Sequence, residues 1–280
     1  MPALLTILKK AEQFLKKKGI SNALFNAEAL FAHALMCERI DLYLRYNSTL
    51  SNEQLDTIRR LLSRRAHHEP LQYIIGEWPF YEVLLNVDKR ALIPRPETEF
   101  MVEWAVKYLQ NKRFYNPSIL DLGTGSGAIA LSLAREFPRS QVTAADKSQD
   151  ALELARENAK KNKLRNLTFV TSRWYSEIYD NFDLIISNPP YLSEEEWEET
   201  DPDVKNFEPK IALVADNQGE ADLRDIIKDA PKFLKKDGLL LLETGPAQHE
   251  NLLNFGQKFF NFSKSKKDQF GRNRFLIFCS

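Results

Sequence analysis

The sequence predicts an α/β fold, in which a small helical domain and a β-hairpin linker precede a mostly parallel, doubly wound sheet. Two patterns carry this prediction. Apolar residues recur at helical spacing in the amino-terminal part, and strand-like and helix-like segments alternate after Pro96. Such alternation is typical of a parallel sheet covered by helices on both faces. We therefore expect a helical domain at 1–75, a hairpin linker at 76–95 and the sheet domain at 96–280.

The amino-terminal domain is expected to contain three amphipathic helices. Leucine, isoleucine and alanine recur every three to four residues over 4–15, and Gly19 is expected to end this first helix. A second helix is predicted over 27–35. The third is predicted to begin at Ser51, whose hydroxyl can cap a helix, and to continue to Leu62.

Aromatic and β-branched residues then replace the helical pattern. Tyr73–Ile75 and Phe80–Leu85 have the composition of strands, and Gly76 and Pro79 interrupt them. We predict a short hairpin here, joining the two domains.

The larger domain is expected to alternate strands with helices. The predicted strands are Ser118–Leu122, Gln141–Ala145, Leu167–Thr171, Phe182–Ser187, Gly238–Glu243 and Arg272–Cys279. Helices are predicted between them, most clearly at Ala128–Glu136 and Asp150–Lys161. Short connections of this kind place helices on the faces of the sheet.

The composition is that of an ordinary globular protein without net charge. Of its 280 residues, 39 are basic and 39 acidic, while 43% are hydrophobic and 28% charged, which excludes intrinsic disorder. The zero net charge also argues against a strongly basic nucleic-acid binder and leaves only a local basic patch open, so no direct nucleic acid binding is expected. Cys37, Cys279 and the four histidines give neither a CxxC pair nor zinc-ligand spacing, so no disulfide or metal site is predicted. Without a signal peptide or a membrane-spanning run, we expect a cytoplasmic protein.

A glycine-rich turn follows the first strand of the larger domain. Its residues are Gly123, Thr124, Gly125, Ser126 and Gly127. Glycines at a strand-to-helix turn let the backbone approach a ligand closely, and the next helix offers unpaired N–H groups. Asp146 lies 19 residues beyond Gly127, directly after the second strand, where a carboxylate can accept both hydroxyls of a ribose. We predict an adenosine-containing cofactor. The spacing fits both a dinucleotide fingerprint and the turn of S-adenosylmethionine enzymes.

The fourth strand ends in Asn188-Pro189-Pro190-Tyr191, which should lie beside the glycine turn. The two prolines restrict the backbone of this loop and have no N–H groups, so that the loop offers carbonyl acceptors without the corresponding donors. Asn188 Oδ1 and the Pro189 carbonyl could accept both hydrogens of a planar NH₂ group, while the Tyr191 ring supports one of its faces. Such a grip would direct the nitrogen lone pair toward an electrophilic methyl group by positioning alone, without a strong base.

These two motifs together resemble those of amino-group methyltransferases that use S-adenosylmethionine. Further segments resemble the bacterial release factor glutamine methyltransferases, the HemK/PrmC family, over nearly the whole chain. These segments are Glu69–Ile74 with Gly76 and Phe80, Ile93–Glu99, Phe207–Pro209, Ala212–Leu213, Glu243–Gln248 and Asp268–Arg274. Among them, Pro94-Arg95-Pro96-Glu97-Thr98-Glu99 is, together with Asn188–Tyr191, the most specific.

The resemblance implies a Rossmann-like methyltransferase domain and methylation of the glutamine side-chain amide in the Gly-Gly-Gln loop of peptide chain release factors. It implies that the helical domain recognises this protein substrate. Cofactor contacts are implied for Gly123–Gly127, Asp146, Trp174 and Asn188, and substrate binding for Asn188–Tyr191, with Asn188, Pro189 and Tyr191 acting in catalysis. Trp174 could stack on adenine or belong to the core.

The chain departs from the family's usual pattern in two places. Arg173 stands where the family commonly has an acidic residue, and Gly219–Leu223 replaces the usual Asp-Gly-Leu. Other charged residues lie near the motifs. Arg95 and Glu97 could close over the cofactor or the substrate loop, or form ion pairs in a domain linker. Residues 194–203 contain seven acids, which form either a solvated face or a surface for a basic protein partner.

Three alternative functions are open from the residues alone. An enzyme methylating adenine or guanine amino groups would use the same grip on NH₂, with Tyr191 stacking on a flipped base. An inactive cofactor-binding protein would use its helices for interaction, although the intact Asn188-Pro189-Pro190 argues against decay. A nicotinamide-dependent dehydrogenase is the weakest alternative, because no obvious acid–base histidine accompanies the glycine turn.

Overall fold

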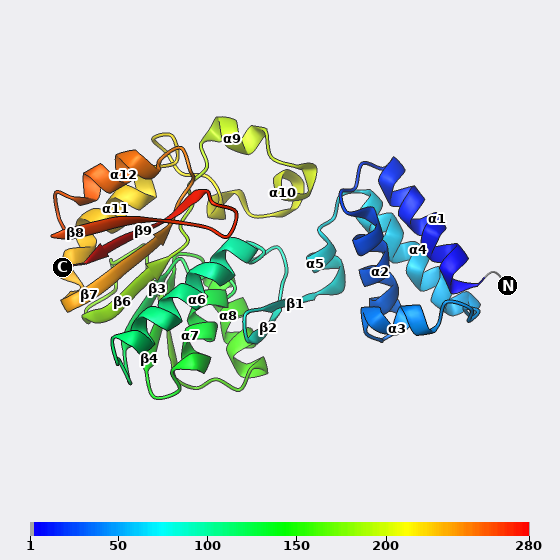
Figure 1. Cartoon of the computed structure of the whole chain (residues 1–280), viewed down its shortest axis with the longest axis horizontal. Helices are drawn as coiled ribbons and strands as arrows, with labels where there is room; N and C mark the ends of the chain where they lie inside the picture. The colour runs from blue at the N-terminus through cyan, green and yellow to red at the C-terminus, as the bar shows by residue number, and fades with distance from the viewer. Residues whose placement is uncertain (1–2, 280) are drawn as a thin grey trace. The chain divides into compact units, whose positions relative to one another are not determined.

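The structure is a computed structural model that describes residues 3–279 (Figure 1). The chain divides into two compact units. One comprises the residues up to Gly76 together with Asp201–Phe207, and the other comprises Glu77–Thr200 together with the residues from Glu208 onward. The second unit contains a seven-stranded sheet flanked by helices, which confirms the predicted α/β class. Among residues 3–279, no helix has both the length and the apolar character needed to cross a membrane.

The described residues of the first unit form helices, apart from an isolated β-bridge between Ala3 and Thr49. Its helices are α1 (Leu4–Lys17), α2 (Ala23–Ala34), α3 (Arg39–Leu44), α4 (Asn52–Ala66), α5 (Leu71–Ile75) and α10 (Pro202–Phe207). The apolar faces of the longer helices form the core, in which Leu15, Phe31 and Ile58 are almost completely buried. Ser51 caps α4 as predicted: its hydroxyl accepts from the Gln54 N–H at 3.2 Å, and the Gln54 side chain accepts from the Ser51 N–H at 2.9 Å.

The prediction that Tyr73–Ile75 belong to a hairpin is wrong. These residues form the helix α5, which begins after Pro70 and ends at Gly76. Gly76 adopts a φ of 81°, and its N–H donates to the Gln72 carbonyl at 2.8 Å. The proline and the left-handed glycine fix both ends of a single helical turn, and these end signals outweigh the strand propensity of the residues between them.

A buried arginine ties the distant segment Asp201–Phe207 to the helical unit. Arg65 of α4, 4% exposed, donates to Asn26 Oδ1 at 2.7 Å, to the Glu69 carbonyl at 3.0 Å and to Asp203 Oδ2 at 2.6 Å. His68 Nδ1 lies 2.9 Å from the other oxygen of Asp203. Asp203, the last acid of the 194–203 run, is therefore part of the fold of the helical unit. Removing its carboxylate would leave the buried Arg65 guanidinium without a negatively charged partner.

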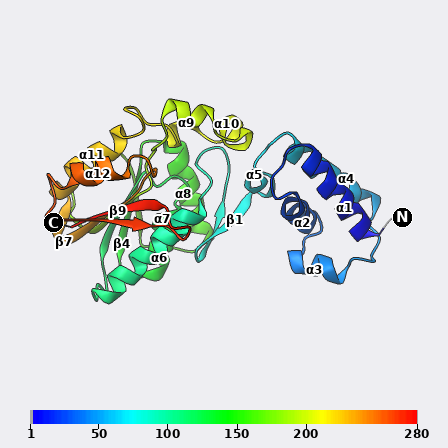
Figure 2. The same cartoon turned by 45° about the horizontal axis from the view of Figure 1, so that its top comes forward.

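The second unit begins with the hairpin of β1 (Glu77–Phe80) and β2 (Val83–Asn86). The strands of the large sheet are β3 (Ser118–Leu122), β4 (Gln141–Asp146), β5 (Leu167–Thr171), β6 (Phe182–Ser187), β7 (Leu234–Glu243), β8 (Phe262–Lys267) and β9 (Asn273–Cys279). All six predicted strands are present with small changes of their limits. Their order is β5-β4-β3-β6-β7-β9-β8. The five strands from β5 to β7 pair in parallel, and β9 pairs antiparallel with both β7 and β8. In Figure 2, β9 is seen as the red strand.

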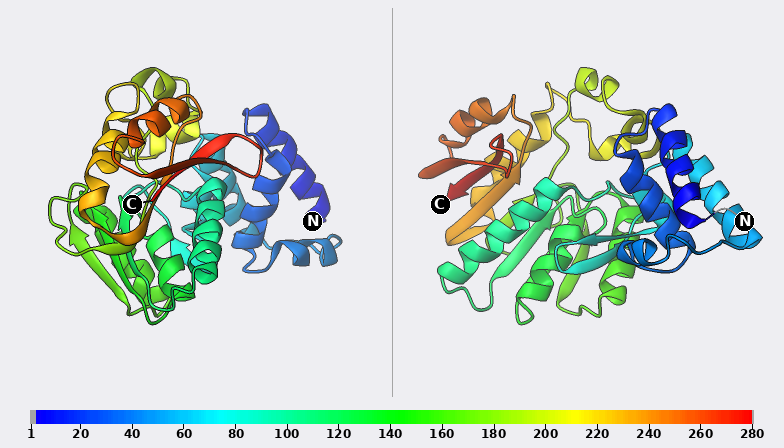
Figure 3. Two further views of the ribbon diagram at one scale, coloured as in Figure 1. Left: turned by 60° about the vertical axis from the view of Figure 1, so that its left-hand side comes forward. Right: turned by 45° about the vertical axis from the view of Figure 1, so that its right-hand side comes forward.

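Helices cover both faces of this sheet. One face carries α6 (Pro96–Asn111), α7 (Ala128–Glu136) and α8 (Gln149–Lys161), and the other carries α11 (Ala221–Asp229) and α12 (His249–Gly256), as Figures 1 and 3 show. The short α9 (Glu194–Glu198) and two 3₁₀ turns, Lys210–Ala212 and Ala230–Lys232, lie in the connections. The central strands β3, β6 and β7 are mainly apolar and buried, as expected for a sheet covered on both faces, whereas β5 and β8 are partly exposed.

The register of the parallel strands brings their carboxyl ends to one edge. Leu122 of β3 pairs with Ala145 of β4 and with Ser187 of β6, and Ser187 in turn pairs with Leu242 of β7. The residues that follow these positions therefore meet at this edge, on both sides of the central strand β3. In open α/β sheets this is the place where ligands bind.

Candidate active site

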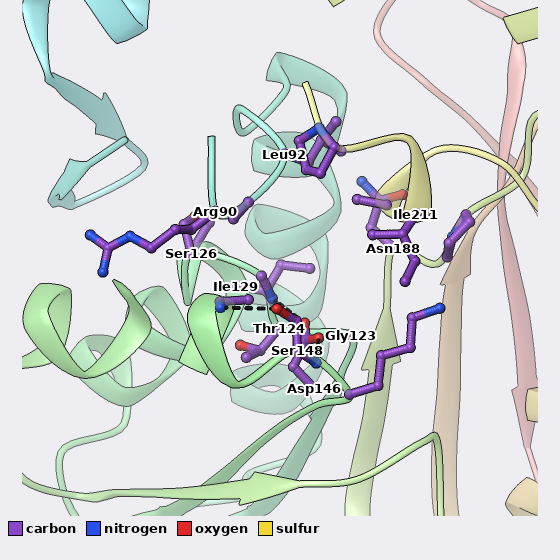
Figure 4. Close-up of a pocket in the computed structure, with 18 of the residues that line it drawn as sticks. Arg90, Leu92, Gly123, Thr124, Ser126, Ile129, Asp146, Ser148, Asn188 and Ile211 are labelled. Carbon is purple, nitrogen blue, oxygen red and sulfur yellow. Dashed lines mark hydrogen bonds between the residues drawn. The ribbon is translucent and has the colours of Figure 1, made fainter. Parts of the chain in front are cut away.

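A cavity at this edge is lined by the glycine turn, the end of β4 and the loop after β6. Figure 4 shows Gly123, Thr124 and Asp146 together on one part of its wall and Asn188 with Ile211 on another. All five predicted residues of the glycine turn except Gly127, together with Asp146, Trp174, Asn188 and Pro190, line the cavity. Pro189 and Tyr191, also predicted site residues, do not line it.

The glycine turn is shaped by a residue that does not itself line the cavity. Gly127 has a φ of 85°, and a Cβ built on it would lie 2.5 Å from Leu131 Cδ1 and 3.2 Å from the Cβ of Ala155 on α8. Only glycine therefore allows α7 to begin here while packing against α8. The packing of α7 against α8 places the first turn of α7 at the wall of the cavity.

The Asp146 carboxylate holds the turn from the adjacent strand. Its Oδ2 accepts from the Gly125 N–H at 2.9 Å and its Oδ1 accepts from the Ser148 N–H at 2.8 Å. Burial raises the pKa of this carboxyl group, while the two backbone N–H groups work in the opposite direction. Each oxygen has a further lone pair for a ligand in the cavity.

Asp121 is a supporting residue that the sequence reasoning did not single out. It is completely buried at the end of β3, and its Oδ2 accepts from Thr124 Oγ at 2.6 Å and from the Ala130 N–H at 3.1 Å. Burial raises the pKa of Asp121 to about 7. A carboxylic residue two positions before the first glycine, in a mainly apolar strand, was the available signal. Its contacts bind the turn to the first residues of α7.

Trp174 lies at the edge of the cavity beside the glycine turn. It has a positive φ of 50°, and its Nε1–H donates to Asp222 Oδ1 at 3.0 Å. The ring approaches Gly123, since a Cβ there would lie 3.5 Å from Trp174 Cζ3, and it also packs against the core beneath the sheet. The neighbouring Arg173 lines the cavity with an exposed side chain. The ring of Trp174 therefore packs against the core on one side and borders the cavity with its edge.

Arg95 and Glu97, for which closure over the site and ion pairing in a linker were both open, each make an ion pair within the second unit. Arg95 Nη2 lies 2.6 Å from Glu208 Oε1, and the other oxygen of Glu208 accepts from the Ile93 N–H at 2.9 Å. Glu97 lies 3.0 Å from Arg272 in the turn between β8 and β9. These contacts fix the segment that leads into α6, and Arg95 also lines the cavity.

The loop after β6 is held in place through its backbone. The Tyr191 N–H donates to the Leu213 carbonyl at 3.2 Å, and the Tyr191 carbonyl accepts from Gln248 Nε2 at 2.5 Å. Gly219 packs directly against this carbonyl, because a Cβ on it would lie only 2.1 Å from the oxygen. With Pro189 and Pro190 buried, the loop is a rigid support for the Asn188 side chain.

A buried polar group lies behind Asn188, and the sequence reasoning missed its central members, Thr98 and Glu243. Asn188 Nδ2 donates to Thr98 Oγ at 3.0 Å, and the Thr98 hydroxyl donates to Glu243 Oε2 at 2.8 Å. Thr98 is 4% exposed and Glu243 1%. The Tyr191 hydroxyl donates to the other oxygen, Glu243 Oε1, at 3.3 Å. Thr98 lies in a helix and Glu243 at the end of a strand, and no sequence spacing between them indicates that they meet.

Comparison with protein families gives two matches along the chain. The family described as the PrmC N-terminal domain matches residues 6–76, and the family described as the methyltransferase small domain matches residues 101–204. The division between them lies close to the boundary between the helical unit and the hairpin.

Several curated relatives share more than a third of their aligned residues with this chain. A release factor glutamine methyltransferase of Fusobacterium nucleatum is 36% identical over 277 residues, which cover 98% of this chain and 78% of the relative. The enzyme of the same name from Streptococcus pneumoniae is 44% identical, with 81% of each chain covered. That of Aliivibrio fischeri is 38% identical, with 97% of this chain and 95% of the relative covered.

Solved structures share the fold of the second unit. A Thermus thermophilus 16S rRNA N2 G1207 methyltransferase, determined with AdoMet and guanosine, has a TM-score of 0.54 at 16% identity, covering 73% of this chain and 49% of its own. A Pyrococcus furiosus methyltransferase has a TM-score of 0.51 at 21% identity, covering 71% and 89%. At these identities the likeness concerns the fold alone.

Proposed function

Because the chain belongs to the release factor glutamine methyltransferase family, we propose that it transfers a methyl group from S-adenosylmethionine to a glutamine of peptide chain release factors. The acceptor is the side-chain amide nitrogen in their Gly-Gly-Gln loop. One observation carries the proposal: Asn188, fixed by a buried hydrogen-bonded group, lines the same cavity as the glycine turn and Asp146.

The residues of the cavity fit an S-adenosylmethionine ligand. Asp146 offers carboxylate oxygens to the ribose hydroxyls, and the cavity edge of Trp174 offers an aromatic surface to adenine. The backbone of the glycine turn, Gly123–Gly127, can approach the ligand closely. When bound, S-adenosylmethionine supplies an electrophilic methyl group attached to a sulfonium centre.

The chain's own contribution to the reaction is positioning. Asn188 Oδ1 accepts one N–H hydrogen of the substrate amide. The Pro189 carbonyl, which follows Asn188 in the loop but does not line the cavity in this structure, accepts the other once the substrate is bound, and the two bonds together fix the plane of the amide. Held in this way, the nitrogen lone pair points out of the amide plane toward the methyl donor, so that no strong base is required before the transfer. The nitrogen is cationic and strongly acidic once methylated, and it then releases one of its two hydrogens as a proton. The Tyr191 hydroxyl, bonded to Glu243, keeps the ring of Tyr191 in place behind this loop.

Mass spectrometry of a purified release factor tests the proposal. After incubation with the full chain and S-adenosylmethionine, we expect one added methyl group on the loop glutamine. A release factor in which that glutamine is replaced by alanine is the matched control and should gain nothing. If no release factor changes mass, the substrate assignment is wrong.

Asp146→Asn is expected to weaken cofactor binding. The substitution keeps the size of the side chain but removes one of two accepting oxygens and the charge, and hydrogen bonds to charged groups contribute about 1.5–3 kcal/mol. We therefore expect an affinity for S-adenosylmethionine that is roughly ten- to a hundredfold lower by isothermal titration calorimetry. Asp150→Asn, an exposed carboxylate in the first turn of α8, is the control and should bind normally. Equal affinities of the two variants would remove Asp146 from the cofactor site.

A further inference from the structure

The amide of Asn188 is the last member of a chain of five hydrogen-bonded side chains, Arg274, Tyr191, Glu243, Thr98 and Asn188, which we call the Asn188 relay. Arg274 Nη1 lies 3.5 Å from the Tyr191 hydroxyl, and the remaining links measure 3.3, 2.8 and 3.0 Å in this order. Its members come from β9, the loop after β6, the end of β7 and the first turn of α6. Elements far apart in sequence thus converge on one side chain.

We propose that the relay fixes which way the Asn188 amide faces, so that Thr98 and Glu243 are positioning residues for the substrate glutamine. This inference rests on the proposed function. Asparagine has a donor end and an acceptor end of almost identical shape, and only the acceptor end can receive an N–H of the substrate amide. A site of this kind needs a device that selects one of the two orientations.

The direction of each hydrogen bond follows from the chemistry of the two ends. A guanidinium has only donors, so the Tyr191 hydroxyl accepts from Arg274 and points its own hydrogen at Glu243. The Thr98 hydroxyl likewise gives its single hydrogen to Glu243. With its hydrogen used in this way, Thr98 Oγ can only accept a hydrogen bond from its other neighbour in the relay, Asn188. Asn188 must therefore turn its NH₂ end toward Thr98. Asn188 Oδ1 is left for the substrate.

This direction depends on the ionisation of Glu243. A carboxylate accepts from both hydroxyls, whereas a protonated Glu243 carries a hydrogen of its own on one oxygen, and Thr98 can then donate to Asn188 instead. The charged groups facing Glu243 are Arg274, which lowers its pKa, and Glu97, which raises it, while Thr98 and Tyr191 stabilise the anion by hydrogen bonds. Burial outweighs them and raises the pKa of Glu243 to about 7. The acceptor orientation is therefore enforced above this pH and is no longer enforced below it.

Kinetics of Thr98→Val and Thr98→Ser test the positioning role. Valine has the shape of threonine without its hydroxyl, so we expect kcat for release factor methylation to fall roughly 10- to 100-fold. Affinity for S-adenosylmethionine should be unchanged, and the thermal unfolding midpoint identifies any variant that fails to fold. Serine restores the hydroxyl and should recover most of the turnover. If Thr98→Val turns over like the wild type, the relay does not position Asn188.

The pH profile separates positioning from a purely structural role. Wild-type kcat should rise with pH through a midpoint near the Glu243 pKa of about 7. Glu243→Gln cannot ionise, yet its oxygen can still accept from Thr98, so this variant should keep part of its activity and lose the rise. A Glu243→Gln variant with the wild-type rise would overturn the inference.

Nuclear magnetic resonance tests the relay without any substrate. The side-chain NH₂ signals of Asn188, assigned by their loss in Asn188→Ala, should shift with pH through the same midpoint. The shift should disappear in Glu243→Gln and in Thr98→Val. Signals that do not respond to pH or to either substitution would refute the relay even if methylation occurs. A wild-type protein that methylates no release factor but shows the shift would instead refute the proposed function alone.

Discussion

Asn188→Ala is expected to lower kcat for release factor methylation by about 10²–10³-fold, the usual effect of removing one preorganised hydrogen-bonding group from an active site. Alanine cannot accept a hydrogen from the substrate amide, which is then free to rotate away from the methyl donor. Cofactor binding should remain measurable, because Asp146 and the glycine turn are unchanged. Single-turnover methylation and calorimetric titration with S-adenosylmethionine provide the two readouts.

The opposite end of the same strand offers a matched control. Asn181 lies just before β6, is exposed, and donates to the Lys232 carbonyl at 3.0 Å, away from the cavity lining. Asn181→Ala should have the turnover of the wild type. If Asn188→Ala is equally active, Asn188 does not grip the substrate and the positioning mechanism is wrong.

Gly219→Ala is expected to lower turnover by about a hundredfold, through a displacement of the substrate loop. The new Cβ would lie 2.1 Å from the Tyr191 carbonyl oxygen and 2.3 Å from Gln248 Nε2, which donates to that oxygen. The new Cβ has no room, because the Tyr191 backbone lies on one side of it and the hydrogen-bonded Gln248 amide on the other. The substrate loop must therefore move. A shift of about 1 Å in a positioning residue costs on the order of 10² in rate.

Gly19→Ala separates this displacement from backbone strain. Gly19 has a φ of 77°, against 79° at Gly219, but its Cβ would meet nothing within 4 Å. Both variants lose about 1–2 kcal/mol from the left-handed conformation, which thermal unfolding measures. Gly19→Ala should nevertheless keep wild-type turnover. Equal turnover of the two variants would show that Gly219 has no influence on the substrate loop.

Most of the fold of the second unit could be predicted from local patterns because its central strands are buried on both faces. Continuous apolar runs such as Phe182–Ser187 stand out when turn residues bound them. The strand β8 was missed for the opposite reason. It lies at the edge of the sheet, and its sequence alternates serine and lysine (Ser263-Lys264-Ser265-Lys266), so it shows little apolar signal. Its place is determined by pairing with β9.

The parts of the candidate site that could be predicted are those built from consecutive residues. The glycine turn and Asn188–Tyr191 each follow a strand, and strand order alone brings them to one edge. Thr98 and Glu243 lie in two of the segments that resemble the family, but nothing in the sequence pairs them, because they are 145 positions apart and meet only when α6 packs beside β7. Polar networks made by tertiary packing have no local period, and only coordinates reveal them.

The ion pair between Arg65 and Asp203 affects how the amino-terminal unit folds while the chain is synthesised on the ribosome. The helices α1 to α5 are made first, but the carboxylate that neutralises Arg65 belongs to a segment that follows the residues up to Thr200. At roughly 5–20 residues per second, the nascent helices wait several to tens of seconds for this partner. During that interval Arg65 has only neutral partners, Asn26 and the Glu69 carbonyl. The amino-terminal unit therefore completes its native ion pair only after most of the chain has been translated.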